Sequence, residues 1–120
     1  MGKSVKSSGG AAPFTGVTLI TGGASGIGAA CAQVFCDAGA TVVICDIQDA
    51  HGYADELTSR GPGTCAFHYC DVSALDTFAE IVQSVAERHG QLDCLINSAA
   101  RFLDWKRIDD ISVQEFRDLW

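Results

Sequence analysis

A glycine-rich octapeptide, T-G-G-A-S-G-I-G, spans Thr21–Gly28 and could bind a phosphate. It follows the apolar, β-branched run Val17–Ile20, which predicts a buried strand, and precedes Ala29–Phe35, which predicts a helix with an apolar face. Glycine lets a diphosphate approach the backbone, where a Cβ would stand in its way. The first-turn N–H groups of the helix and its positive dipole end would then receive the negative charge.

The spacing of these glycines differs from two common nucleotide-binding patterns. G-x-G-x-x-G is absent, because Cys31 occupies the third glycine position after Gly26 and Gly28. The P-loop is absent too, since Ala29 stands where its lysine should be. The pattern present is T-G-x-x-x-G-x-G. A glycine turn without a ligand is the alternative, but a strand before it and a helix after it favour a cofactor site.

Asp46 is the candidate for binding a ribose. It directly follows Thr41–Cys45, an apolar run that predicts a second strand, and lies 18 positions after Gly28. A carboxylate at this spacing accepts hydrogen bonds from a ribose diol and repels a 2′-phosphate. Neither Ser25 nor Ile47 offers the positive charge that an NADP site would want. The sequence therefore predicts NAD as the cofactor, with a simple turn aspartate as the alternative.

Strands and helices that position these residues alternate along the chain. Gly39, Gly61-Pro62-Gly63 and Gly90 are expected to end successive helices. The predicted helices cover Ile27–Ala38, Asp49–Arg60, a segment from Ser73 to Gly90 and a segment after Ser112, and the predicted strands cover Val17–Ile20, Thr41–Cys45, Thr64–Tyr69 and Leu92–Ile96.

The third helix has its own start signal. Ser73 is a plausible N-cap, with Asp76 three residues later in the manner of a capping box. Its expected buried stripe consists of Ala74, Phe78, Ile81, Val82 and Val85.

The βαβαβαβ order predicts an α/β fold. Right-handed crossovers give a Rossmann-type, doubly wound parallel sheet in the order 3-2-1-4, truncated after the fourth strand. The first strand lies at the crevice where the chain direction switches, which is where such sheets bind ligands. We expect residues 1–13 to form a flexible tail and residues 14–120 an incomplete NAD-binding Rossmann domain.

Composition excludes several functions. The chain has 120 residues, a net charge of −7 and a pI near 4.6, which argue for one domain and against nucleic-acid or anionic-membrane binding. No apolar run approaches the roughly 18 residues of a transmembrane helix. Met1–Pro13 has no apolar centre and is not expected to be a signal peptide.

The six cysteines predict free, buried thiols rather than a disulfide set or a zinc site. None forms C-x-x-C, and most fall in expected strands or on helix faces. Such thiols indicate a reducing compartment, the cytoplasm. His51, His68 and His89 lack metal-ligand spacing, so no metal is expected.

T-G-x-x-x-G-x-G is the form found in short-chain dehydrogenases/reductases, which the chain resembles over Gly16–Trp120. The resemblance includes the family's hydroxysteroid dehydrogenases. It implies NAD-dependent oxidation of a secondary alcohol or reduction of a ketone, with steroids among the candidate substrates, and a homo-oligomer for the full-length form. It is carried by Thr21–Gly28, Val42–Asp46, Cys70–Val72, Gly90–Cys94 and Ser112–Arg117.

The resemblance also implies a cofactor site at the strand tips. The Asp71 carboxylate would accept a hydrogen bond from the exocyclic amine of adenine, and Val72 would lie near the ring. Asp71 could instead cap the third helix. Asn97 would contact the nicotinamide-side ribose. Ser98 and Ala100 depart from the family's N-N-A-G. The implied cofactor-binding residues are Gly22, Ser25, Gly26, Ile27, Gly28, Asp46, Asp71, Val72 and Asn97.

No catalytic residue is assigned. The family uses Tyr-x-x-x-Lys, but Leu57 stands four residues after Tyr53, and Ser73 four after Tyr69. We therefore expect these 120 residues alone to be inactive, with the fourth strand as an exposed edge. Phe102, Leu103 and Trp105 could line a substrate entrance or anchor their loop.

Two other functions compete with this interpretation. A non-catalytic dinucleotide-binding or decoy module would share the same glycine turn. An S-adenosylmethionine methyltransferase is disfavoured by the three-residue spacer between Gly22 and Gly26 and by Asn97-Ser98-Ala99 after the fourth strand.

Overall fold

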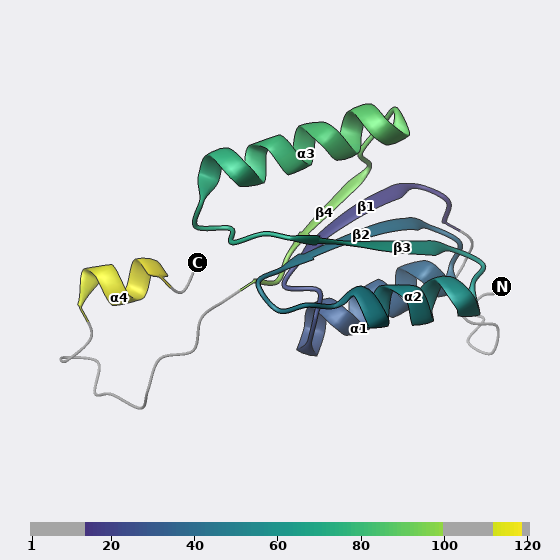
Figure 1. The fold of residues 1–120 in the computed structure, drawn as a ribbon, viewed down its shortest axis with the longest axis horizontal. Coiled ribbons are helices and arrows are strands. Elements are labelled where there is room, and N and C mark those ends of the chain that lie inside the picture. Colours follow the sequence, from purple (N-terminus) through teal and green to yellow (C-terminus); the bar gives the residue numbers. More distant parts are fainter. Residues whose placement is uncertain (1–13, 100–111, 119–120) are drawn as a thin grey trace, which may run out of the picture.

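Four parallel strands form a single sheet in the order β3-β2-β1-β4 (Figure 1). The computed structural model describes residues 14–99 and 112–118. The predicted fold class and strand order are confirmed. The strands are β1 (Val17–Thr21), β2 (Thr41–Asp46), β3 (Thr64–Tyr69) and β4 (Cys94–Asn97).

Helices cover both faces of this sheet (Figure 1). Helices α1 (Gly26–Asp37) and α2 (His51–Arg60) lie on one face, and α3 (Leu75–His89) lies on the other. The short helix α4 (Val113–Asp118) directly follows Ser112, as predicted. None of the described helices is long and apolar enough to cross a membrane.

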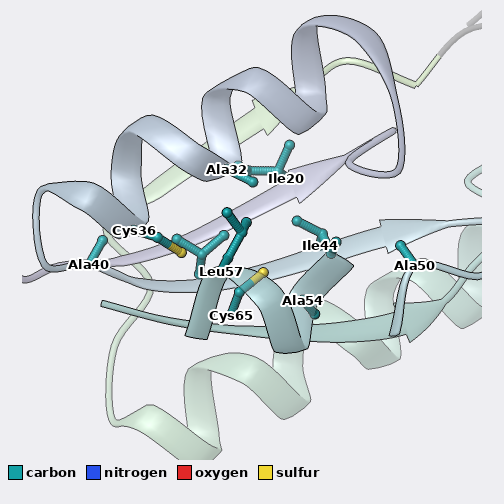
Figure 2. Close-up of a cluster of buried hydrophobic side chains, with 10 residues drawn as sticks. Ile20, Ala32, Cys36, Ala40, Ile44, Ala50, Ala54, Leu57 and Cys65 are labelled. Atoms are coloured by element: carbon teal, nitrogen blue, oxygen red, sulfur yellow. The ribbon is translucent and has the colours of Figure 1, made fainter. Parts of the chain in front are cut away.

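Each face of the sheet has its own apolar core. Ile20 and Ile44 pack with Leu57 and the small residues of α1 and α2, as Figure 2 shows. On the opposite face, Leu19 and Val43 pack with Val85 of α3. Successive residues of β1 and β2 therefore alternate between two cores, which explains their unbroken apolar runs.

The start of α3 differs from the predicted capping box. Ala74 is the N-cap, and no side chain caps the helix. Ser73 donates instead to Asp71, with its N–H 3.0 Å and its hydroxyl 2.7 Å from Oδ1. This local turn competes with the cap because aspartate readily bonds backbone two residues ahead. Ala74 is exposed rather than part of the buried stripe.

Two other boundaries shift by two residues. Helix α2 begins at His51 rather than Asp49, because Oδ1 of Asp49 accepts from the His51 N–H at 3.0 Å. Strand β4 begins at Cys94 rather than Leu92. Leu92 packs against the core beneath α3 instead of pairing in the sheet.

All six cysteines are free thiols. Cys36, Cys45, Cys65 and Cys70 are buried, whereas Cys31 and Cys94 are half-buried. Burial, together with the nearby Cys70 and Asp46, raises the pKa of Cys45 to about 12. A thiol held this firmly in its protonated form is a packing group and not a nucleophile.

The Thr18 hydroxyl is fully buried and has no hydrogen-bond partner among the described residues. Burying such a group without a partner carries the full cost of removing it from water.

We expect Thr18→Val to raise the free energy of unfolding by about 1 kcal/mol, because valine keeps the shape and removes the unpaired hydroxyl. Thr21→Val is the matched control, since Oγ1 of Thr21 accepts two main-chain hydrogen bonds. It should lower the same quantity by about 1–3 kcal/mol. Urea unfolding measures both changes. An equal loss of unfolding free energy in the two variants would contradict the conclusion that the Thr18 hydroxyl is unpaired.

A side chain of α2 covers part of the outer edge of β3. Oγ1 of Thr58 accepts from the Cys65 N–H at 2.9 Å and lies 3.0 Å from the carbonyl oxygens of Cys65 and Ala54. An unpaired strand edge is a template for aggregation, so this hydroxyl both anchors α2 and occupies the edge.

Thr58→Val should lower the free energy of unfolding by about 1–2 kcal/mol, because the Cys65 main chain loses its partner. It should also increase self-association, measured by light scattering at equal concentration. Ser59→Ala changes the neighbouring exposed position on the same helix and should leave both unchanged. A Thr58→Val variant that behaves like Ser59→Ala would show that the edge does not depend on this hydroxyl.

Candidate functional site

The glycine turn joins β1 to α1 and is bonded to the tip of β2. The Gly22 N–H donates to the Cys45 carbonyl at 2.8 Å, and the Gly23 N–H donates to the same oxygen at 3.3 Å. Gly22 and Gly26 have φ angles of 71° and 58°, which only glycine adopts readily. The turn is thus fixed by its own backbone conformation and by β2.

At two of these positions the backbone is packed so closely that only glycine fits. A Cβ on Gly28 would collide with the Gly22 carbonyl group. A Cβ on Gly22 would lie 2.7 Å from the Ala99 nitrogen. The first turn of α1 therefore lies directly against the tip of β1, and the segment after β4 lies against the turn.

Gly28→Ala should lower the free energy of unfolding by about 3 kcal/mol, because the rigid backbone of Gly22 cannot move aside. Gly52→Ala is the control. Gly52 lies in α2 with open space around it, so alanine there should raise stability by about 0.5–1 kcal/mol. Thermal unfolding distinguishes the two, and a tolerated Gly28→Ala would contradict the close contact.

The N-terminus of α1 is open. Ser25 is its N-cap, and no side chain caps the helix. The first-turn N–H groups of a helix have no partner within it. Ser25, Gly26 and Ile27 are exposed, Ile27 to 78%, and nothing lies within 4 Å of where a Cβ of Gly26 would be. Main-chain donors and a positive dipole end thus face space that an anion can enter.

Asp46 lies beside the turn, at the end of β2. Its Oδ2 accepts from the Ala24 N–H at 3.0 Å, and its Oδ1 accepts from the Gln48 N–H at 3.0 Å. Each oxygen retains capacity for a further hydrogen bond. The structure therefore brings together the predicted acid and the glycine turn, and their bonds fix the orientation of the carboxylate.

Asp71 and Val72 follow β3 at the same end of the sheet. The Cys70 N–H donates to the Asp46 carbonyl at 3.0 Å, which ties the end of β3 to the end of β2. Both Asp71 and Val72 are half-buried. Oδ1 of Asp71 receives the two Ser73 bonds described above, so this carboxylate also stabilises the turn before α3.

Asn97 ends β4 opposite Thr21 and is exposed. The next two residues are held by Thr21, whose Oγ1 accepts from the Ser98 N–H at 3.1 Å and the Ala99 N–H at 3.3 Å. Sequence analysis did not single out Thr21 as a positioning residue. A hydroxyl at the end of an apolar strand was the available signal, but its partners lie 77 and 78 residues away.

Tyr53 is a second positioning residue that sequence analysis missed. Its hydroxyl donates to the Ala29 carbonyl and so joins α2 to the beginning of α1. Burial raises the pKa of Tyr53, which keeps the hydroxyl protonated and able to donate. Ala100, Phe102, Leu103 and Trp105 lie outside the described residues.

The sequence matches a known enzyme family. The family model described as "Enoyl-(Acyl carrier protein) reductase" matches residues 22–120. L-fucose dehydrogenase of Oryctolagus cuniculus is 37% identical over 103 residues, which cover 86% of this chain and 35% of that protein. Tropinone reductase-like 1 of Erythroxylum coca is 45% identical over 83 residues, 69% of this chain and 30% of that protein.

The chain belongs to the short-chain dehydrogenase/reductase family. Members are oxidoreductases that act on CH–OH groups and bind nicotinamide dinucleotides. The chain spans about a third of the length of these curated relatives.

Solved structures agree with this assignment. A short-chain dehydrogenase from Mycobacterium smegmatis superposes with a TM-score of 0.78 at 29% identity, covering 92% of this chain and 47% of that one. L-sorbose reductase from Gluconobacter frateurii, solved with NADPH and L-sorbose, gives a TM-score of 0.77 at 27% identity, covering 88% and 41%.

Proposed function

We propose that the complete protein is an NAD-dependent oxidoreductase that interconverts a secondary alcohol and a ketone, and that residues 14–120 form the NAD-binding part. The bound cofactor would supply or accept the hydride. The observation that carries the proposal is the position of Asp46, whose carboxylate is bonded to the glycine turn at the open N-terminus of α1.

Each part of the dinucleotide has complementary residues. The α1 N-terminus would bind the pyrophosphate through main-chain N–H groups of Ser25–Gly28, with Ile27 as an apolar contact. Gly22, whose own N–H is bonded to Cys45, would set the conformation of the turn. Asp46 would accept from the adenosine ribose. Asp71 and Val72 would lie by the adenine, and Asn97 by the other ribose. These groups share the carboxyl end of one parallel sheet, where ligands of open α/β sheets bind.

The negative charge of Asp46 favours NAD over NADP. L-sorbose reductase was solved with NADPH, so family membership does not by itself select NAD. Here the residues that bond to or flank Asp46 include Ala24, Ile47 and Gln48, and none is cationic. A 2′-phosphate would meet the Asp46 carboxylate without a compensating charge, which costs affinity.

Asp46→Asn tests this proposal, because it keeps an acceptor oxygen and removes the charge. We expect it to weaken NAD binding about tenfold or more and to reduce the preference for NAD over NADP, as measured by calorimetry on the full-length protein. Asp49→Asn removes an exposed charge three residues later and should change neither value. Wild-type protein without affinity for NAD, or unchanged affinity in Asp46→Asn, would refute the proposal.

The substrate is proposed only as a class. A secondary alcohol or ketone follows from the family chemistry, and the resemblance to hydroxysteroid dehydrogenases makes a steroid one candidate. The similarity to L-fucose dehydrogenase makes a sugar another. Neither Tyr53 nor Tyr69 has a lysine four residues later, so we assign no general acid or base to this chain.

We also propose a cytoplasmic protein that assembles into homo-oligomers. The location rests on six free cysteines, four of them buried in the core. The assembly rests on the family alone, whose members are commonly oligomeric.

A further inference from the structure

A cavity lies at the β3 edge of the sheet, lined by residues of β2, β3 and the C-terminal half of α3 and by Thr58 of α2. Its volume is about 200 Å³. It extends along β3 from Thr64, the first residue of that strand, to His68, the residue before its last. Asp46 and the residues of the glycine turn are not among those that line it. Whatever this cavity binds would not compete with a dinucleotide at the strand tips.

The polar groups of the cavity are all neutral or basic. His68 comes from β3, and Arg88 and His89 come from the last turn of α3. Hydroxyls of Ser84 and Thr64 join them. None of the described residues that line the cavity is acidic, although the chain has 15 acidic residues and only 8 lysines and arginines.

Arg88 has no ion-pair partner in the described ranges 14–99 and 112–118. Arg60, by contrast, lies 3.5 Å from the carboxylate of Asp37. The helix dipole favours a base anywhere around the last turn of α3. It does not explain why Arg88 and His89 line the same cavity as a histidine and hydroxyls from the sheet.

These donors match an oxyanion. A guanidinium binds carboxylate and phosphate oxygens through paired hydrogen bonds, and hydroxyls and imidazoles can donate to the remaining oxygens. Val43, Ala66 and Val85 supply an apolar surface beside the donors. Thr64, Ser84 and Arg88 are exposed, so the cavity opens to solvent and a small anion can enter it.

We propose that this cavity is a second binding site that accepts a small oxyanion, either phosphate or a short carboxylate. Its principal charged contact is Arg88. The site is separate from the proposed dinucleotide site, because none of the residues that line the cavity is among the proposed dinucleotide contacts.

Calorimetric titration of the full-length protein with inorganic phosphate, and separately with butyrate, tests the proposal. We expect saturable binding of at least one probe with a Kd below about 10 mM. Arg88→Gln should weaken that binding about tenfold, since it removes the charged donor. Arg60→Gln removes the same charge outside the cavity and should leave the Kd unchanged.

The two probes separate a phosphate site from a carboxylate site. Should Arg88→Gln fail to fold, as judged by its thermal midpoint, His68→Gln takes its place with the same direction of change expected. Absence of saturable binding for both probes would overturn the proposal. Equal weakening by Arg88→Gln and Arg60→Gln would overturn it too, because it would indicate general charge attraction rather than a site. Loss of NAD binding in Asp46→Asn with phosphate or butyrate binding retained would leave this proposal standing.

Discussion

The contact between the Gly28 backbone and the Gly22 carbonyl determines how the first helix meets the sheet. Because neither residue has a side chain in the way, α1 starts directly above the tip of β1. Its free N–H groups then point into the space beyond the strand ends. A residue bulkier than glycine at position 28 would move α1 outward and separate its first-turn N–H groups from Asp46. The glycines therefore serve the packing of the fold first, and the same closeness leaves the first-turn N–H groups of α1 beside Asp46.

Hydrogen bonds to main-chain groups connect the tips of the strands to one another. Asp46 holds the glycine turn through Ala24, and Thr21 holds the segment after β4 through Ser98. The Cys70 N–H links β3 to β2. The polar end of the sheet is thus a connected set of hydrogen bonds across all four strands, above two apolar cores that fix the strands. Removing one of these side chains would disturb its neighbours as well as its own contact.

Long, buried β-branched runs made the sheet predictable, and the right-handed crossover rule supplied its order. The helix starts were less predictable, because Asp71 bonds Ser73 locally and thereby removes the expected cap. Thr21 and Tyr53 escaped prediction for another reason. Their partners are distant in sequence, so no local pattern reports the contact. The position of Asp46 beside the glycine turn was predictable, because it depends on a spacing that the fold keeps constant.

Charged side chains lie at both ends of the sheet. Asp46 and Asp71 lie at the carboxyl end, where helix N-termini and main-chain N–H groups offset their negative charge. Arg88 and His89 lie at the amino end, at the C-terminus of α3, where the helix dipole favours positive charge. In a parallel sheet the crossover helices run antiparallel to the strands. Helix N-termini, which favour negative charge, therefore lie at the carboxyl end of the sheet, and helix C-termini, which favour positive charge, lie at its amino end. The same topology thus places the carboxylates of Asp46 and Asp71 at the strand tips and the basic residues Arg88 and His89 at the end of α3.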